Sequence, residues 1–226
     1  MPELDMTQLL ALAAAIGWAS GIRLYLVVLL TGMAGYFGWV ALPSGLHLLA
    51  NPVVMGVAGF MVFIEFFADK IPGLDSLWDM VHTVVRIPAG AALAAGVFSG
   101  DHAVMALVAA LLGGGFAATA HAAKATTRAA INTSPEPFSN VGAALVEDTM
   151  VPAGLWLAVA HPLVFVVLFI AVLAISVWLI RKSWRFLRGL VARVTHIFSG
   201  RPDPGVVSAF QSRSDSKKLP GDPPHV

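Results

Sequence analysis

Apolar runs that approach the thickness of a lipid bilayer limit this chain to a helical membrane fold. The longest run extends from Leu9 to about Val40, and the cleanest from Pro162 to Ile180. A helix needs about 20 predominantly apolar residues to cross a bilayer. Of the 226 residues, 58% are hydrophobic and 12% are charged, whereas a soluble domain carries about 25% charged residues. The sequence therefore predicts an all-α, polytopic membrane domain.

Six membrane-spanning helices account best for these runs. Residues 1–8 form a short N-terminal tail, and the membrane domain covers residues 9–180. The expected spans cover residues 9–40, 52–67, 85–98, 102–120, 141–159 and 162–180. The first run is longer than one straight span, and glycines such as Gly17 and Gly21 allow it to bend, break or end in a short second piece.

The distribution of basic residues predicts the topology. Of the 14 Lys and Arg residues, nine lie from Arg181 onward. Because cytoplasmic loops carry an excess of Lys and Arg, this end should be cytoplasmic. Six spans then place Lys70, Arg86, Lys124 and Arg128 on the same side. Both termini are therefore expected in the cytoplasm.

The segment after the last apolar run should lie outside the bilayer core. Residues 181–198 carry five Lys and Arg residues, with Trp184, Leu187 and Phe198 on another helical face. A basic amphipathic helix of this kind binds anionic lipid. Residues 199–226 are rich in Pro, Ser, Asp and Lys, which predicts a disordered tail. The expected partners are the bilayer and anionic lipid, without nucleic acid, and a homo-oligomer is left open.

One stretch, residues 69–90, places charge between two apolar runs. Asp75, Asp79, His82 and Arg86 follow one another at spacings that align them on one face of a helix. That face either lies wet at the membrane surface or lines a polar cavity that enters the bundle. Ionisable side chains inside a membrane are costly and usually mark a functional path.

A short repeat favours the cavity. The Pro-Ala-Gly sequence of residues 88–90 returns at residues 152–154, and an acidic pair precedes the second copy. Proline leaves an earlier carbonyl without its helical partner, and such carbonyls at membrane depth face protein or water. We therefore expect the acidic pair, Glu147 and Asp148, to bind a base across a parallel internal repeat. The candidates for that base are Arg86 and Lys70.

Arg23 is a further anomaly, because it lies deep in the first apolar run. It should point inward to a carboxylate, either Glu65 or Asp148. A structural ion pair and an anion-binding arginine are equally open.

A basic stripe of His121, Lys124 and Arg128 follows the fourth run at helical spacing. Positive charge at the cytoplasmic surface explains this stripe best. Pairing with Asp75 and Asp79, or attraction of a phosphate group, is the alternative.

Metal and cofactor chemistry has little support. The chain contains no Cys, which excludes disulfides, thiolate metal sites and cysteine nucleophiles. Asp75, Asp79 and His82 are weak candidates for a divalent ion, since three ligands on one helix seldom complete a site. Phosphate-loop, dinucleotide-binding and serine-nucleophile motifs are absent from the sequence, and no cofactor is expected.

Several of these motifs resemble those of a known family. They are the segments at residues 19–25 (ASGIRLY), 65–75 (EFFADKIPGLD) and 78–90, which holds Trp-Asp, His-Thr and Arg-Ile-Pro-Ala-Gly. Together they resemble a bacterial integral-membrane family catalogued as domain of unknown function 4126, DUF4126. The likeness extends from about Leu9 to Ile180. It implies a multi-pass protein of the bacterial inner membrane and supplies no activity, substrate or catalytic residue.

Three functions are compatible with the sequence. The first is a transporter or channel-like protein with a pathway for a small polar or anionic solute. Its pathway residues would be Arg23, Glu65, Asp69, Lys70, Asp79, His82, Arg86, Glu147 and Asp148. The second is a non-catalytic structural or assembly subunit whose charges fix the bundle. The third is a metal-dependent enzyme acting on a lipid headgroup, with Lys124 and Arg128 binding phosphate.

Overall fold

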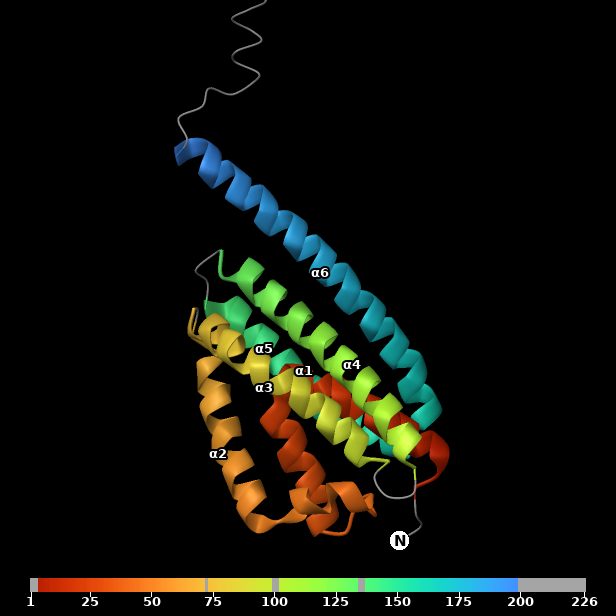
Figure 1. Cartoon of the computed structure of the whole chain (residues 1–226). Coiled ribbons are helices and arrows are strands. Elements are labelled where there is room, and N and C mark those ends of the chain that lie inside the picture. The colour runs from red at the N-terminus through yellow and green to blue at the C-terminus, as the bar shows by residue number, and fades with distance from the viewer. Residues whose placement is uncertain (1–3, 72, 99–101, 134–136, 199–226) are drawn as a thin grey trace, which may run out of the picture. The chain divides into compact units, whose positions relative to one another are not determined.

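A computed structural model describes residues 4–71, 73–98, 102–133 and 137–198 of the chain. Within these residues every regular element is a helix, as the sequence predicts (Figure 1). The seven helices are α1 (Met6–Tyr36), η1 (Ser44–Ala50), α2 (Pro52–Ala68), α3 (Leu74–Gly96), α4 (Ala103–Ile131), α5 (Pro137–Ala160) and α6 (Pro162–Phe198).

Their composition indicates an integral membrane protein. Four helical segments of the described chain are long and apolar enough to cross a membrane, namely α1, α4, residues 138–160 and residues 162–185. A fifth candidate is η1 together with α2, which meet at 68°. α3 is not among these candidates, and Asp75, Asp79, His82 and Arg86 lower its hydropathy.

α1 is broken at Arg23 and folds back on itself. Arg23 has φ −140° and ψ 72°, outside the helical region. Leu12 in the first arm (residues 6–22) and Leu30 in the second arm (residues 24–36) line the same cavity. A straight helix would separate these two residues by about 27 Å. The sequence allowed a break in this run, and the structure places it at Arg23.

Both arms of α1 lead to the same end of the bundle. The side-chain amide of Gln8 donates a hydrogen bond of 2.9 Å to the carbonyl of Val159, near the end of α5. The second arm continues into η1, whose Leu46 lies against Gly96 at the end of α3. α1 is therefore a re-entrant hairpin. We call this side the His161 end, after the turn between α5 and α6, and the opposite side the Asp69 end, after the turn between α2 and α3.

The hairpin bears on the topology expected from the sequence. After it, the chain runs five times between the two ends, through α2, α3, α4, α5 and the first part of α6 (Figure 1). The start of α1 and residue 184 consequently lie at opposite ends. The sequence left open whether the first apolar run is one span or two pieces. The count of six spans and the side of each terminus stay predictions, since four or five helical segments of the described chain qualify as spans.

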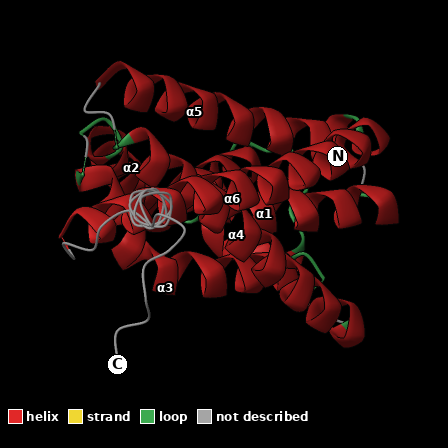
Figure 2. Cartoon of the chain, turned by 90° about the horizontal axis from the view of Figure 1, so that it is seen from above, coloured by secondary structure: helices red, strands yellow, loops and turns green. Residues whose placement is uncertain are grey.

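The first arm of α1 forms the centre of the bundle. In Figure 2, α3 and α5 lie on opposite sides of α1. Gly17 and Gly21 touch α4 so closely that a Cβ added at Gly21 would lie 2.2 Å from the carbonyl oxygen of Ala117. Small residues permit such close backbone approach, which is a main source of helix association in lipid.

The outer helices present apolar side chains to their surroundings. On α2, Phe60, Phe63 and Phe67 are exposed, and α6 exposes residues such as Leu163 and Val167. An outward apolar surface is expected of helices that contact lipid. A smaller contact fixes the start of α6, where Phe169 packs edge-on against Trp18.

Three predicted features stay predictions. α6 is helical as far as Phe198, with no break at residue 181, but residues 185–226 form a separate unit and their lipid contact is untested. The tail of residues 199–226 lies outside the described residues. The internal repeat is the last of these features. α3 and α5 run in the same direction, as a parallel repeat requires. The matching glycines of its two copies differ, since Gly90 is tightly packed whereas a Cβ added at Gly154 has no neighbour within 4 Å.

Candidate functional site

Arg23, at the break in α1, holds three carboxylates from two other parts of the chain. Its guanidinium lies 3.1 Å from Asp69, 2.9 Å from Asp148 and 3.8 Å from Glu147. The Arg23 side chain is 1% exposed. A charge buried so deeply persists in a membrane protein only when it is paired. The break in the helix thus places a charged tip among acidic residues.

Arg86 holds a second group of carboxylates. One of its terminal nitrogens bonds to Glu65, and the other lies 2.6 Å from Asp79, seven residues earlier on α3. All three side chains are at most 2% exposed. Arginine suits this position because its planar guanidinium donates in two directions at once.

Two basic residues of α4 join these groups. Lys124 Nζ lies 3.1 Å from Asp69, 3.4 Å from Asp79 and 3.3 Å from Glu147. It also donates to the carbonyl of Ile22, which the break in α1 leaves without a helical partner. Arg128 lies 3.1 Å from Glu147.

We call these nine connected side chains the ion network: Arg23, Glu65, Asp69, Asp79, Arg86, Lys124, Arg128, Glu147 and Asp148. It contains four cations and five carboxylates. The ion network therefore has one carboxylate more than it has cations. Including two charged neighbours, Lys70 and Asp75, adds one charge of each sign and leaves this surplus unchanged. Four of its buried oxygens, on Glu65, Asp69, Asp79 and Glu147, have no hydrogen-bond partner.

Two histidines border the ion network. His121 Nε2 lies 2.7 Å from the hydroxyl of Thr83, which itself donates to the carbonyl of Asp79. The hydroxyl has one proton, so His121 Nε2 must donate to it. His121 Nδ1 then accepts from Arg86 at 3.4 Å.

His82 is oriented by two contacts. Its Nδ1 lies 2.8 Å from the carbonyl of Trp78, which can only accept, so Nδ1 carries a proton. Its Nε2 lies 3.2 Å from the hydroxyl of Tyr25. Tyr25 is two residues beyond Arg23, so this bond ties the second arm of α1 to α3.

Comparison with known proteins identifies the membrane domain. The family described as "Domain of unknown function (DUF4126)" matches residues 10–182, which include the whole ion network. The chain belongs to the DUF4126 family. No curated protein and no solved structure matches it.

In this DUF4126 chain the base that binds the acidic pair differs from the one expected. Arg23, not Arg86 or Lys70, contacts Glu147 and Asp148. Arg86 turns to Glu65 and Asp79 because both lie within reach on its own side of the bundle. The expected pair of Arg23 with Asp148 is present.

Lys70 lies outside the ion network. Its ammonium donates 3.1 Å to the carbonyl of Phe66 and lies over the ring of the same residue. It makes no ion pair within the described residues. Of the nine pathway residues expected from the sequence, Lys70 and His82 are therefore neighbours of the ion network rather than members.

The expected metal ligands do not gather around one point. Asp75 accepts from Asn132 at 2.8 Å and from the backbone of Gly73, while Asp79 binds Arg86 and Lys124 and His82 binds Tyr25. In the described part of the chain, no three His, Asp or Glu side chains form a group that could hold a metal ion. The described structure therefore gives the weak metal hypothesis no support, and it stays a prediction.

The sequence interpretation named the basic stripe of α4 but favoured a role for it at the cytoplasmic surface. His121, Lys124 and Arg128 are buried in the bundle rather than exposed at its surface. Their spacing places all three on one face of a helix, and the alternative of pairing with the acidic face of α3 was based on that spacing. The pairing considered with Asp79 is present through Lys124.

Asp69 should make the protein sensitive to acid. Burial favours the neutral form, but Lys124, Arg23 and Arg128 outweigh it and hold the pKa of Asp69 below its ordinary value. With the folded pKa below the unfolded value of about 3.9, the carboxylate stabilises the protein above that pH. This contribution is lost as the pH falls through the folded pKa.

We expect Asp69→Asn to flatten the decline of Tm in detergent between about pH 5 and about pH 3. The control Asp5→Asn, at the cap of α1, should keep the wild-type slope; an equal slope for Asp69→Asn would contradict the prediction.

Proposed function

We propose that this protein conducts protons across the membrane through the ion network. The observation that carries the proposal is the surplus of one carboxylate in a network buried among apolar helices. An uncompensated charge is costly at such depth, and proton relays in membranes use buried Asp and Glu side chains. One bound proton restores neutrality, and exchanging that proton gives the network its transport activity.

The broken helix supports a transport role. Transporters place ions at interrupted helices, where unwound backbone and helix ends contribute to the site. Here the interruption at Arg23 frees the carbonyl of Ile22, which binds Lys124. Because Arg23 and Lys124 both bind Asp69, a shift of α1 would redistribute charge in the network.

A proton fits the network better than the alternatives. Every cation of the ion network already has a carboxylate partner, so the polar or anionic solute expected from the sequence would have to displace one. The acidic side chains also fail to group around a metal ion within the described chain. A proton needs only one carboxylate oxygen.

Glu65 is the carboxylate that holds this proton in the proposal. It is 0% exposed and has one ion-pair partner, Arg86, whereas Asp69 and Asp79 each have two. Lys124, Arg23 and Asp69 are its other charged neighbours. The fewer cations surround a buried carboxylate, the more its neutral form is favoured.

The proton would enter from the Asp69 end. Asp148 is 28% exposed and Glu147 12% exposed, so α5 connects the network to solvent. From there the carboxylates of Asp79 and Glu65 lie further inside, and Lys124 and Arg86 hold them by ion pairs without passing the proton themselves. Toward the His161 end, the close contacts of Gly17 with α4 block the path. Release on that side requires α1 to move, with the break at Arg23 as the flexible point.

Proton flux into proteoliposomes tests this function. A potassium gradient with valinomycin would drive protons toward an enclosed pH-sensitive dye. We expect wild-type flux above that of empty liposomes and at least tenfold lower flux for Glu65→Gln, because the amide cannot exchange a proton. Thr149→Val, beside Asp148 on an exposed face of α5, should retain the wild-type flux. Wild-type flux equal to that of empty liposomes would overturn the proposal.

A structural role is the second candidate, and the complete pairing of the four cations favours it. In that case Glu65→Gln would remove surplus charge and raise Tm without affecting any flux. Our proposal keeps four further expectations from the sequence. The protein lies in the bacterial inner membrane, and its Asp69 end faces the cytoplasm. Residues 181–198 bind anionic lipid, and the chain forms a homo-oligomer.

A further inference from the structure

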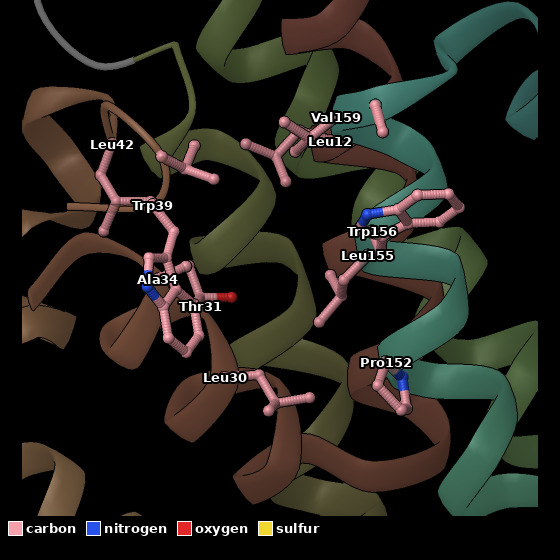
Figure 3. A pocket seen from close by; sticks show the side chains of 12 residues that line it. Leu12, Leu30, Thr31, Ala34, Trp39, Leu42, Pro152, Leu155, Trp156 and Val159 are labelled. Carbon is pink, nitrogen blue, oxygen red and sulfur yellow. The ribbon is translucent and has the colours of Figure 1, made fainter. Parts of the chain in front are cut away.

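A second site lies apart from the ion network, between the two arms of α1 and α5. It is a cavity of about 550 Å³, shown in Figure 3. Leu12 belongs to the first arm, Leu30 and Thr31 to the second arm, and Leu155 and Trp156 to α5. Its volume falls within the range of small-molecule sites, about 300–1,000 Å³. The re-entrant fold of α1 creates this space because the two arms diverge from Arg23.

The lining excludes a charged or strongly polar ligand. Twelve residues line the cavity, and none of them is ionisable. Thr31 supplies the only hydroxyl, and Trp39 and Trp156 supply indole rings (Figure 3). A polar solute would lose its hydration here without gaining enough hydrogen bonds. The ligand must therefore be largely hydrocarbon.

The aromatic side chains place the cavity relative to the bilayer. Trp39 stacks on Phe37, which contacts Tyr36, and Trp156 packs against His161. Trp39 and Trp156 are both more than half exposed. Tryptophan and tyrosine gather where hydrocarbon meets lipid headgroups. This group therefore marks the bilayer boundary at the His161 end, with the cavity on its hydrocarbon side.

We propose that the cavity binds one acyl chain of a phospholipid from the leaflet at the His161 end. Its apolar wall is continuous with the outward surface of α5, where Trp156 is exposed. A lipid can thus insert one chain while its headgroup stays level with Trp39 and Trp156. The bound chain fills the space between the arms of α1 and fixes their angle. Headgroup charge contributes nothing, because no charged residue lines the site.

Native mass spectrometry of the detergent-purified full chain tests this site. Phosphatidylglycerol and phosphatidylethanolamine with the same acyl chains would be added separately. We expect one retained phospholipid per chain, with equal occupancy for the two headgroups. Leu155→Trp fills the cavity and should lower occupancy at least tenfold. Leu111→Trp, on an exposed face of α4, is the matched control and should retain wild-type occupancy.

Several outcomes would overturn the acyl-chain site. They are no lipid retained by wild type, equal retention by Leu155→Trp, or retention of the anionic lipid alone. Should Leu155→Trp fail gel filtration as a folded protein, Ala34→Phe fills the same cavity from the second arm. Lipid occupancy is measured separately from proton flux, and Leu155 and Ala34 lie outside the ion network, so a failure of either proposal can be told from a failure of the other.

Discussion

Replacing Arg86 with Met is expected to destabilise the protein by about 3–5 kcal/mol. Within the described residues, the substitution removes the only ion-pair partner of Glu65 and one of two partners of Asp79. Both carboxylates would remain buried, and methionine supplies no hydrogen-bond donor. Breaking one side of a buried ion pair costs more than the pair itself contributes, because the other charge is left in a low-dielectric medium. Thermal unfolding in detergent, with gel filtration to measure the folded fraction, gives the change.

A second substitution separates the charge effect from a loss of packing. Arg86→Met combined with Glu65→Gln should recover part of the lost stability, since the uncompensated carboxylate becomes a neutral amide. Lys70→Met is the matched control, because Lys70 is a basic residue without an ion pair in the described structure. It should change stability by less than about 1 kcal/mol. An Arg86→Met protein as stable as Lys70→Met would show that the ion network does not support the fold.

Gly21→Ala is expected to disrupt the centre of the bundle. Its added Cβ would lie 2.2 Å from the carbonyl oxygen of Ala117 and 2.9 Å from the Ala117 Cα. These are backbone atoms of α4, so no side-chain rotation relieves the overlap, and α1 must move away. Overpacking costs about 1–3 kcal/mol, occasionally more. We expect this variant at or above the upper end of that range, measured as a lower Tm in detergent.

Gly115→Ala on α4 is the matched control for Gly21→Ala. An added Cβ at Gly115 has no neighbour within 4 Å. In a helix interior, alanine is favoured over glycine by about 0.5–1 kcal/mol, so Tm should stay constant or rise. A Gly21→Ala protein with wild-type Tm would mean that the backbones of α1 and α4 are not in close contact.

The movement of α1 links these two substitutions to the proposed function. Gly21 packs against α4 two residues before the break, and Arg23 at the break binds three carboxylates. A displacement of the first arm therefore alters the ion network directly. The acyl chain proposed between the arms would oppose such a displacement. Lipid occupancy and proton flux are thus two separate measurements on one moving element.

Local sequence patterns determined the class of the fold and many members of the site. Long apolar runs admit only helices in lipid, since every backbone group must be satisfied within its own segment. The spacing of Asp79, His82 and Arg86 along the chain is enough to align them on one face of a helix. Buried charge requires partners, so Arg23 had to point inward. Each of these conclusions depends on neighbours in the sequence or on the solvent alone.

Only the tertiary structure decided how α1 folds and which charges meet. The apolar run of residues 9–40 has the composition of a span, and nothing in its hydropathy distinguishes a crossing from a hairpin. The packing of Gly17 and Gly21 against α4, together with the partners of Arg23, selects the hairpin. Likewise, the sequence alone places Lys124 at the membrane surface by the rule for cytoplasmic positive charge. In the folded chain, carboxylates at the end of α2, on α3 and on α5 surround and bind it. Which charges pair depends on residues that are far apart in the sequence. Hydropathy and charge bias do not tell which of these residues lie close together in the folded chain.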